Sequence, residues 1–116
     1  LALKSAAVAR CLPEVAYFDF IAAAFDTQAS WVAKPRLQSF DAVLELAAVL
    51  APDRQALEAC AADEVLLDGI VRMKQEGEQK YGVDSTPSFV INGRSYAGAL
   101  SPAELARIID PLLASR

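Results

Sequence analysis

The side chains of the most reactive type are two cysteines, Cys11 and Cys60, the only cysteines in the chain. A thiol reacts as its thiolate, which the start of a helix or a neighbouring cation stabilises. The helical patterns place each cysteine near a helix end, so their positions give little support for a reactive thiolate. The chain has no histidine, which excludes Ser-His and Cys-His catalysis and removes the commonest zinc ligand. No metal-site spacing is present, and we expect neither a metal nor a cofactor.

Three interpretations of the cysteine pair remain open. The favoured one is a structural disulfide between Cys11 and Cys60; the others are two buried free thiols and a redox-active pair. An unstrained bridge would close a loop of about fifty residues and stabilise the fold by about 4 kcal/mol in the chain-entropy model.

A second group of unusual residues is the stretch DSTPSFVINGRSYAG, residues 84–98. Pro87 lies directly before the β-rich run SFVI, where it cannot donate a ladder hydrogen bond. The Asn-Gly pair that follows predicts a two-residue type I′ turn between two strands. The sequence SPAE then predicts a last helix that is capped by Ser101 and has Pro102 in its first turn.

The region before this stretch is predicted to be helical. The expected helices cover residues 1–11, a segment opened by Pro13, residues 40–50, a short segment from Pro52 to Cys60, and a longer segment to about Lys80. Asp63 is the expected cap of this longer helix, and Gly82 ends it. Trp31 and Pro35 mark a loop. The second segment carries an apolar stripe at helical spacing: Val15, Phe18, Ile21, Ala22 and Phe25. Five aromatic residues are interpreted as core: Phe18, Phe20, Phe25, Trp31 and Phe40.

Composition narrows the class of protein. The chain is 54% hydrophobic, which indicates a folded domain rather than a disordered one. Its net charge of −4, with Lys and Arg scattered, argues against nucleic-acid binding. No apolar run approaches the roughly 18 to 20 residues of a membrane span.

The predicted hairpin lacks a neighbour in this sequence. The run SFVI is apolar on both faces, as an interior strand is, and a two-stranded hairpin is marginal by itself. No segment before it resembles a strand. We therefore expect its open edge to be covered either by a segment outside this sequence or by a second copy, which would give a dimer.

The Thr-Pro step before a strand, the Asn-Gly hairpin and the capped last helix together resemble the C-terminal half of the thioredoxin fold. GVDSTPSFVING is the most specific part, and ARCLPEVAYFDFIAAAF and LEACAADEVLLDGI resemble the helical insertion of DsbA-like thiol–disulfide oxidoreductases. The resemblance implies an α/β, thioredoxin-like fold. Residues 1–81 would be the helical insertion and residues 82–116 the C-terminal part of the thioredoxin-like domain.

The same resemblance implies a substrate-binding loop at residues 85–87. Pro87 would be the family's cis-proline, and Ser85 and Thr86 would lie beside it. In the family this loop contacts the redox cysteine and offers backbone hydrogen bonds to an extended polypeptide. The alternative is a trans proline at the entry to an edge strand.

The sequence departs from the family because it has no C-x-x-C motif and no N-terminal strand, helix and strand. We expect this fragment to hold half of an active site and to be inactive alone. The function expected for the intact protein is disulfide exchange with cysteine-containing polypeptides and a redox partner protein, in the periplasm or outside a bacterial cell. The alternatives are a non-catalytic scaffold and a glutathione-dependent isomerase with a serine in place of the first cysteine.

Overall fold

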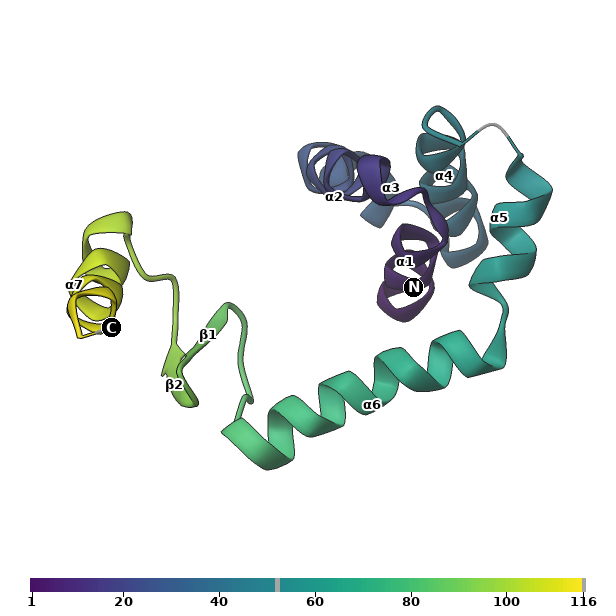
Figure 1. The fold of residues 1–116 in the computed structure, drawn as a ribbon. Helices are drawn as coiled ribbons and strands as arrows, with labels where there is room; N and C mark the ends of the chain where they lie inside the picture. Colours follow the sequence, from purple (N-terminus) through teal and green to yellow (C-terminus); the bar gives the residue numbers. More distant parts are fainter. Residues whose placement is uncertain (52, 116) are drawn as a thin grey trace. The chain divides into compact units, whose positions relative to one another are not determined.

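The computed structural model describes residues 1–51 and 53–115, which form two compact units, Leu1–Arg72 and Met73–Arg116. Helices make up most of the chain (Figure 1). The elements are α1 (Ala2–Cys11), η1 (Glu14–Ala16), α2 (Tyr17–Asp26), α3 (Gln28–Val32), α4 (Arg36–Ala48), α5 (Arg54–Ala61), α6 (Glu64–Tyr81), β1 (Ser88–Ile91), β2 (Arg94–Ala97) and α7 (Pro102–Ala114). The two units divide inside α6, whereas the boundary expected between residues 81 and 82 stays a prediction.

The first unit is built around α1. This helix contacts α2, α4 and α5, and Figure 1 shows it among them. Ala7, Val8 and Ala9 of α1 are buried, and the two alanines let neighbouring helices approach closely. The largest fully buried side chains of the unit are Phe20, Leu44, Val8, Val43 and Ser39. The first unit therefore has a continuous apolar core of its own.

Helix α2 turns a different face to this core than its apolar stripe predicts. Phe20 is 1% exposed, whereas Phe18 and Phe25 are 77% and 68% exposed, so the prediction that these two are core residues is wrong. Seven residues make two turns of a helix, so Phe18 and Phe25 share a side, and Phe20 lies roughly 200° away from Phe18. The face that contains Phe20 is the one that α1 and α4 cover.

The prediction for residues 27–40 is also corrected. Trp31 lies in α3 rather than in a loop, and its indole Nε1–H donates to the Ala24 carbonyl at 3.0 Å. Helix α4 begins at Arg36, four residues before the expected start. Pro35 directly precedes this first turn with φ −55°, a backbone conformation that suits a residue leading into a helix. The proline was interpreted as part of a loop, but it marks a helix start.

Aspartate caps begin the next two helices. Asp53 accepts a hydrogen bond from the Ala56 N–H at 3.0 Å at the start of α5. Asp63 accepts from the N–H groups of Val65 and Leu66 at 2.8 Å and 3.3 Å, which confirms the predicted cap of α6. The expected restart of the helix at Pro52 lies outside the described residues.

The second unit contains the predicted hairpin. β1 and β2 pair antiparallel, with Phe89 opposite Tyr96. Asn92 and Gly93 have φ of 48° and 81°, which confirms a turn with two left-handed residues. The Ser101 hydroxyl accepts from the Glu104 N–H at 3.1 Å and so caps α7, as predicted.

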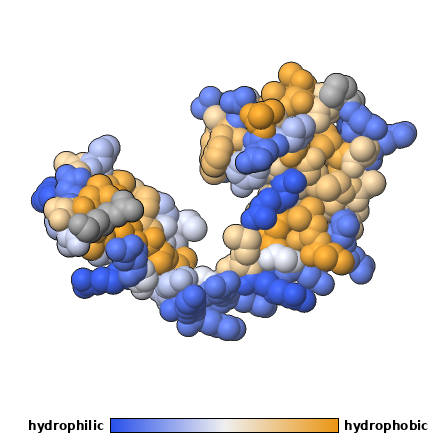
Figure 2. Space-filling model, in the orientation of Figure 1, coloured by the Kyte–Doolittle hydropathy of each residue, from blue (hydrophilic) through white to orange (hydrophobic). Residues whose placement is uncertain are grey.

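The second unit buries little apolar surface within the described residues. None of its side chains from Met73 to Ser115 is fully buried. Apolar side chains of β1 and α7 remain partly exposed, among them Val90 at 41% and Leu113 at 53%, and Figure 2 shows apolar surface over α7. In the described part of the chain the sheet has two strands only. Such a sheet is marginal in water unless another element covers it.

Candidate functional site

The loop that carries the predicted substrate-binding residues is held in place at its helical end. Gly82 ends α6 with φ 66°, a conformation that glycine adopts without steric cost. Its N–H donates to the Glu78 carbonyl at 3.0 Å, and the Val83 N–H donates to the Gly77 carbonyl at 3.1 Å. The Ser95 hydroxyl of β2 donates to the Tyr81 carbonyl. The loop therefore leaves the helix in a fixed direction.

The loop is also held at its strand end. The Ser88 hydroxyl donates to the Ser85 carbonyl at 2.6 Å, and the Gly98 N–H donates to the Pro87 carbonyl at 2.9 Å. The Thr86–Pro87 peptide bond is cis. Ser85, Thr86 and Pro87 are all exposed.

Thr86 differs from its neighbours because its backbone is free. Within the described residues no hydrogen bond involves its N–H or its carbonyl, although the carbonyls on both sides, of Ser85 and Pro87, are occupied. An exposed strand-entry residue with a free donor and a free acceptor is able to pair with an extended peptide. The three predicted residues thus lie in one exposed loop, and both backbone polar groups of Thr86 are available for hydrogen bonding.

A hollow of about 480 Å³ lies beside this loop. One wall is formed by Met73, Lys74, Gly77 and Glu78 of α6, and the other by residues 83–86. The Lys74 ammonium lies 3.8 Å from a Glu78 carboxylate oxygen, and both side chains are largely exposed. The sequence predicts the helix that contains Met73 and Gly77 but not the hollow, because the hollow exists only where the loop turns back beside the helix.

One cation near the end of α6 has a shifted pKa. A hydrogen-bond interaction with Tyr81 is the largest cause that raises the pKa of Lys80, followed by the charges of Tyr81 and Glu76. The Lys80 ammonium lies 5.2 Å from the centre of the Tyr81 ring and 3.9 Å from a Glu76 carboxylate oxygen. These interactions favour the protonated form of the Lys80 side chain.

Cys11 and Cys60 form a disulfide, with an S–S distance of 1.99 Å and Cα atoms 6.0 Å apart. The bridge joins the last residue of α1 to the last turn of α5, within the first unit. Both cysteines of the chain are thus in the disulfide, and neither is a free thiol. The structure has the arrangement that was favoured from the sequence.

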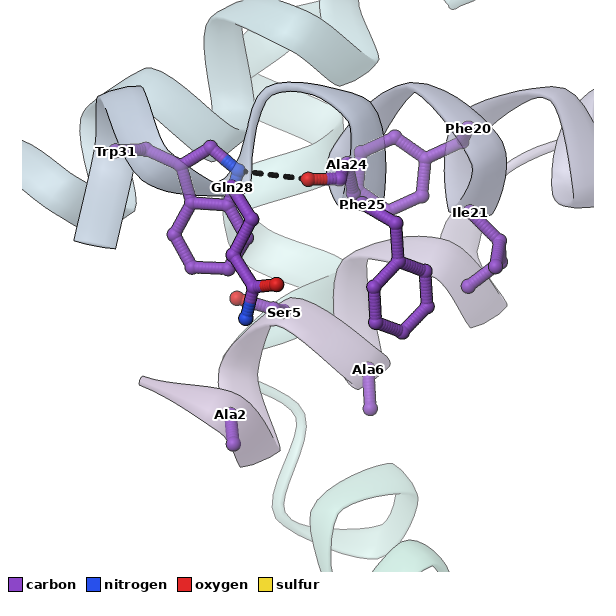
Figure 3. A pocket seen from close by; sticks show the side chains of 9 residues that line it. All are labelled: Ala2, Ser5, Ala6, Phe20, Ile21, Ala24, Phe25, Gln28 and Trp31. Carbon is purple, nitrogen blue, oxygen red and sulfur yellow. Dashed lines mark hydrogen bonds between the residues drawn. The ribbon is translucent and has the colours of Figure 1, made fainter. Parts of the chain in front are cut away.

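A second, smaller cavity of about 200 Å³ lies in the first unit (Figure 3). Its walls come from α1, α2 and α3, and the lining residues are Ala2, Ser5, Ala6, Phe20, Ile21, Ala24, Phe25, Gln28 and Trp31. Figure 3 shows the Trp31 indole bonded to the Ala24 carbonyl, with the Gln28 side chain near Ser5. This cavity is not predictable from the sequence pattern, which assigns Trp31 to a loop and Phe25 to the core.

Other classes of site have no support in the described residues. No group of three or more His, Cys, Asp or Glu side chains is arranged there to hold a metal ion. Among the helices of residues 1–51 and 53–115, none combines the length and the apolar character that a bilayer-crossing helix needs.

Comparison with known proteins gave one finding. A sequence model of a family described as thioredoxin matches residues 2–111, which takes in both units. Neither the curated proteins nor the solved structures contained a match.

Proposed function

We propose, since this chain belongs to the thioredoxin family, that it is the helical and substrate-contacting part of a DsbA-like thiol–disulfide oxidoreductase. The observation that carries this proposal is the free backbone of Thr86 in an exposed loop that is anchored on both sides. The substrates would be polypeptides with cysteines, and Ser85, Thr86 and Pro87 would form the surface that receives them.

The proposed contact is a short stretch of strand pairing. An extended peptide that lies along residues 85–87 would accept from the Thr86 N–H and donate to the Thr86 carbonyl. Because main-chain groups make these bonds, the contact would accept many sequences. This suits an enzyme that acts on varied polypeptides.

The reactive dithiol would belong to a part of the protein outside residues 1–116. The sequence contains no C-x-x-C, and its two cysteines are bonded to each other. In the exchange itself, a thiolate attacks one sulfur of a disulfide, a mixed disulfide forms, and the other sulfur leaves as a thiolate. A second thiolate then attacks the mixed disulfide and releases the product, so the number of disulfides is conserved.

The Cys11–Cys60 bridge supports the proposed location. Disulfides persist in oxidising compartments and are rare in the reducing cytosol. We therefore propose that the protein works in the periplasm or outside the cell. A redox partner protein would return the cysteine pair to its starting oxidation state after each turnover.

The test is to follow the Thr86 amide by NMR in the intact protein. An extended peptide with serine in place of cysteine should shift the Thr86 amide signal and slow its exchange with water, because the amide gains an acceptor. The amides of Asn92 and Gly93, at the hairpin turn, serve as the control and should not move. A saturating peptide that leaves the Thr86 amide unchanged would contradict the proposed contact.

The second candidate is a non-catalytic scaffold with a thioredoxin-like shape. It is favoured by one observation, that the only two cysteines of this sequence are joined in a bridge. The residues preceding Leu1 in the intact protein discriminate between the candidates. A C-x-x-C after an apolar strand would favour the oxidoreductase, and a lone serine there would favour the glutathione-dependent isomerase. The absence of both would favour the scaffold.

A further inference from the structure

The hollow beside the substrate loop has a glycine in its helical wall. Gly77 lies within α6. Alanine at this position would raise the equilibrium constant for helix formation about twofold to fivefold. A Cβ at this position would lie 3.9 Å from the Val83 Cβ, an ordinary contact distance, so no backbone constraint requires the glycine. Its φ is not in the left-handed region either. The effect of the glycine is to leave the hollow open between α6 and the loop.

The walls of the hollow combine apolar surface with charge. Met73, Gly77 and Val83 supply the apolar surface. Lys74, Glu78 and Asp84 supply the charges, which sum to −1. Glu78 is paired with Lys74 at 3.8 Å, whereas Asp84 has no ion pair within the part of the chain that the structure describes. The charge left without a counter-ion is therefore a carboxylate.

The hollow is continuous with the loop that carries the free Thr86 backbone. Ser85 and Thr86 both line it. Successive side chains of an extended peptide point to opposite sides, so a peptide paired with Thr86 directs alternate side chains toward the mouth of the hollow.

We propose that the hollow between α6 and residues 83–86 is a subsite for a lysine or arginine side chain of the bound polypeptide. This inference rests on the proposed function, because it needs a peptide on the loop. The aliphatic stem of this lysine or arginine would lie against Met73, Gly77 and Val83. Its cationic group would lie beside the carboxylates of Asp84 and Glu78. The protein would thus prefer substrates with a basic residue near the reacting cysteine.

The expected preference is modest, because the carboxylates are exposed. A surface ion pair contributes little free energy, and the corresponding preference for arginine over leucine is about twofold to fivefold in affinity. A glutamate at the same position should bind more weakly than leucine, since Asp84 repels it.

The test measures affinities of the intact protein for extended peptides with a central serine in place of cysteine. The serine is flanked on both sides by arginine, leucine or glutamate, and binding is followed at the Thr86 amide by NMR. We expect the order arginine, leucine, glutamate. Asp84→Asn should bring the ratio of arginine to leucine affinity close to one, whereas Lys74→Gln should raise it, because it removes the repelling ammonium.

Two pairs of variants separate the subsite from general effects. Asp68→Asn changes the net charge by the same amount on an exposed part of α6 outside the hollow, and it should leave the ratio unchanged. Gly77→Leu should fill the hollow and abolish the arginine preference without lowering the melting temperature. Gly69→Leu, the same substitution in the same helix, has no atom within 4 Å of the added Cβ and should keep the preference.

The outcomes distinguish this inference from the function on which it rests. If the arginine and leucine peptides bind equally, or if Asp84→Asn leaves their ratio unchanged, the subsite is wrong and the peptide-binding loop stands. If no peptide moves the Thr86 amide, both proposals are wrong.

Discussion

Phe18 and Phe20 lie two residues apart in α2 in opposite environments. Phe20 is 1% exposed in the core of the first unit, and Phe18 is 77% exposed. Phe20→Ala should lower the free energy of unfolding by about 3–5 kcal/mol, because it leaves a cavity among close-packed helices. Phe18→Ala is the matched control and should change it by less than about 0.5 kcal/mol. Urea denaturation measures both, and equal losses would contradict the orientation of α2.

Ser39 is the one polar side chain among the buried residues of the described chain. Its hydroxyl hydrogen is shared between the carbonyls of Trp31 at 2.6 Å and Lys34 at 2.8 Å, which ties the start of α4 to α3. Ser39→Ala should cost about 1–3 kcal/mol in the free energy of unfolding, since the Lys34 carbonyl loses its side-chain donor and the Trp31 carbonyl keeps only the Lys34 N–H at 3.3 Å. Ser30→Ala removes an exposed bond of similar length and should cost less. If Ser39→Ala lowers the free energy of unfolding less than Ser30→Ala does, the Ser39 hydrogen bonds do not stabilise the junction of α3 and α4.

At the scale of elements, the disulfide holds α1 to α5. Replacing both Cys11 and Cys60 by alanine should lower the free energy of unfolding by about 2–5 kcal/mol, because the unfolded chain loses a long closed loop. Reductant should produce the same loss in the unmodified protein and no further loss in the variant. Chemical denaturation with and without reductant makes this comparison. An unchanged midpoint on reduction would show that the bridge does not stabilise the first unit.

Local signals predicted the elements best. The Asn-Gly turn, the caps at Asp63 and Ser101 and the stop at Gly82 each depend on a few adjacent residues, and each is present in the structure. The start of α4 was misplaced because Pro35 fits both a loop and a helix start. The face of α2 was misassigned because periodicity finds an apolar stripe, whereas the packing of α1 and α4 decides which side is buried.

For the candidate site too, features set by adjacent residues could be predicted from the sequence, and features set by packing could not. The cis proline and the exposed loop of residues 85–87 could be predicted from the sequence, because the Thr-Pro step lies directly before the hairpin, whereas the role of these residues in substrate binding stays a prediction. The free backbone of Thr86 and the hollow beside Gly77 could not, because both depend on the path of the loop past α6 and on which carbonyls Ser88 and Gly98 occupy.

At the scale of the whole molecule, the two units differ in how much they bury. The first has an apolar core, and no described side chain of the second is fully buried. In residues 1–116 alone, the amides of β1 and β2 should therefore exchange with water faster than those of α1 and α4. In the intact protein the hairpin amides should become protected. Protection that instead rises with the concentration of the 116-residue chain would identify a second copy as the cover.

We propose that residues 85–87 supply part of the substrate surface of an oxidoreductase whose reactive dithiol belongs to another part of the protein. The most direct measurement is the rate at which the intact protein and residues 1–116 each form disulfides in a reduced, unfolded polypeptide. We expect turnover by the intact protein and none by residues 1–116. Dithiol-dependent turnover by the 116-residue chain would contradict it and assign the chemistry to Cys11 and Cys60, and an inactive intact protein would favour the scaffold.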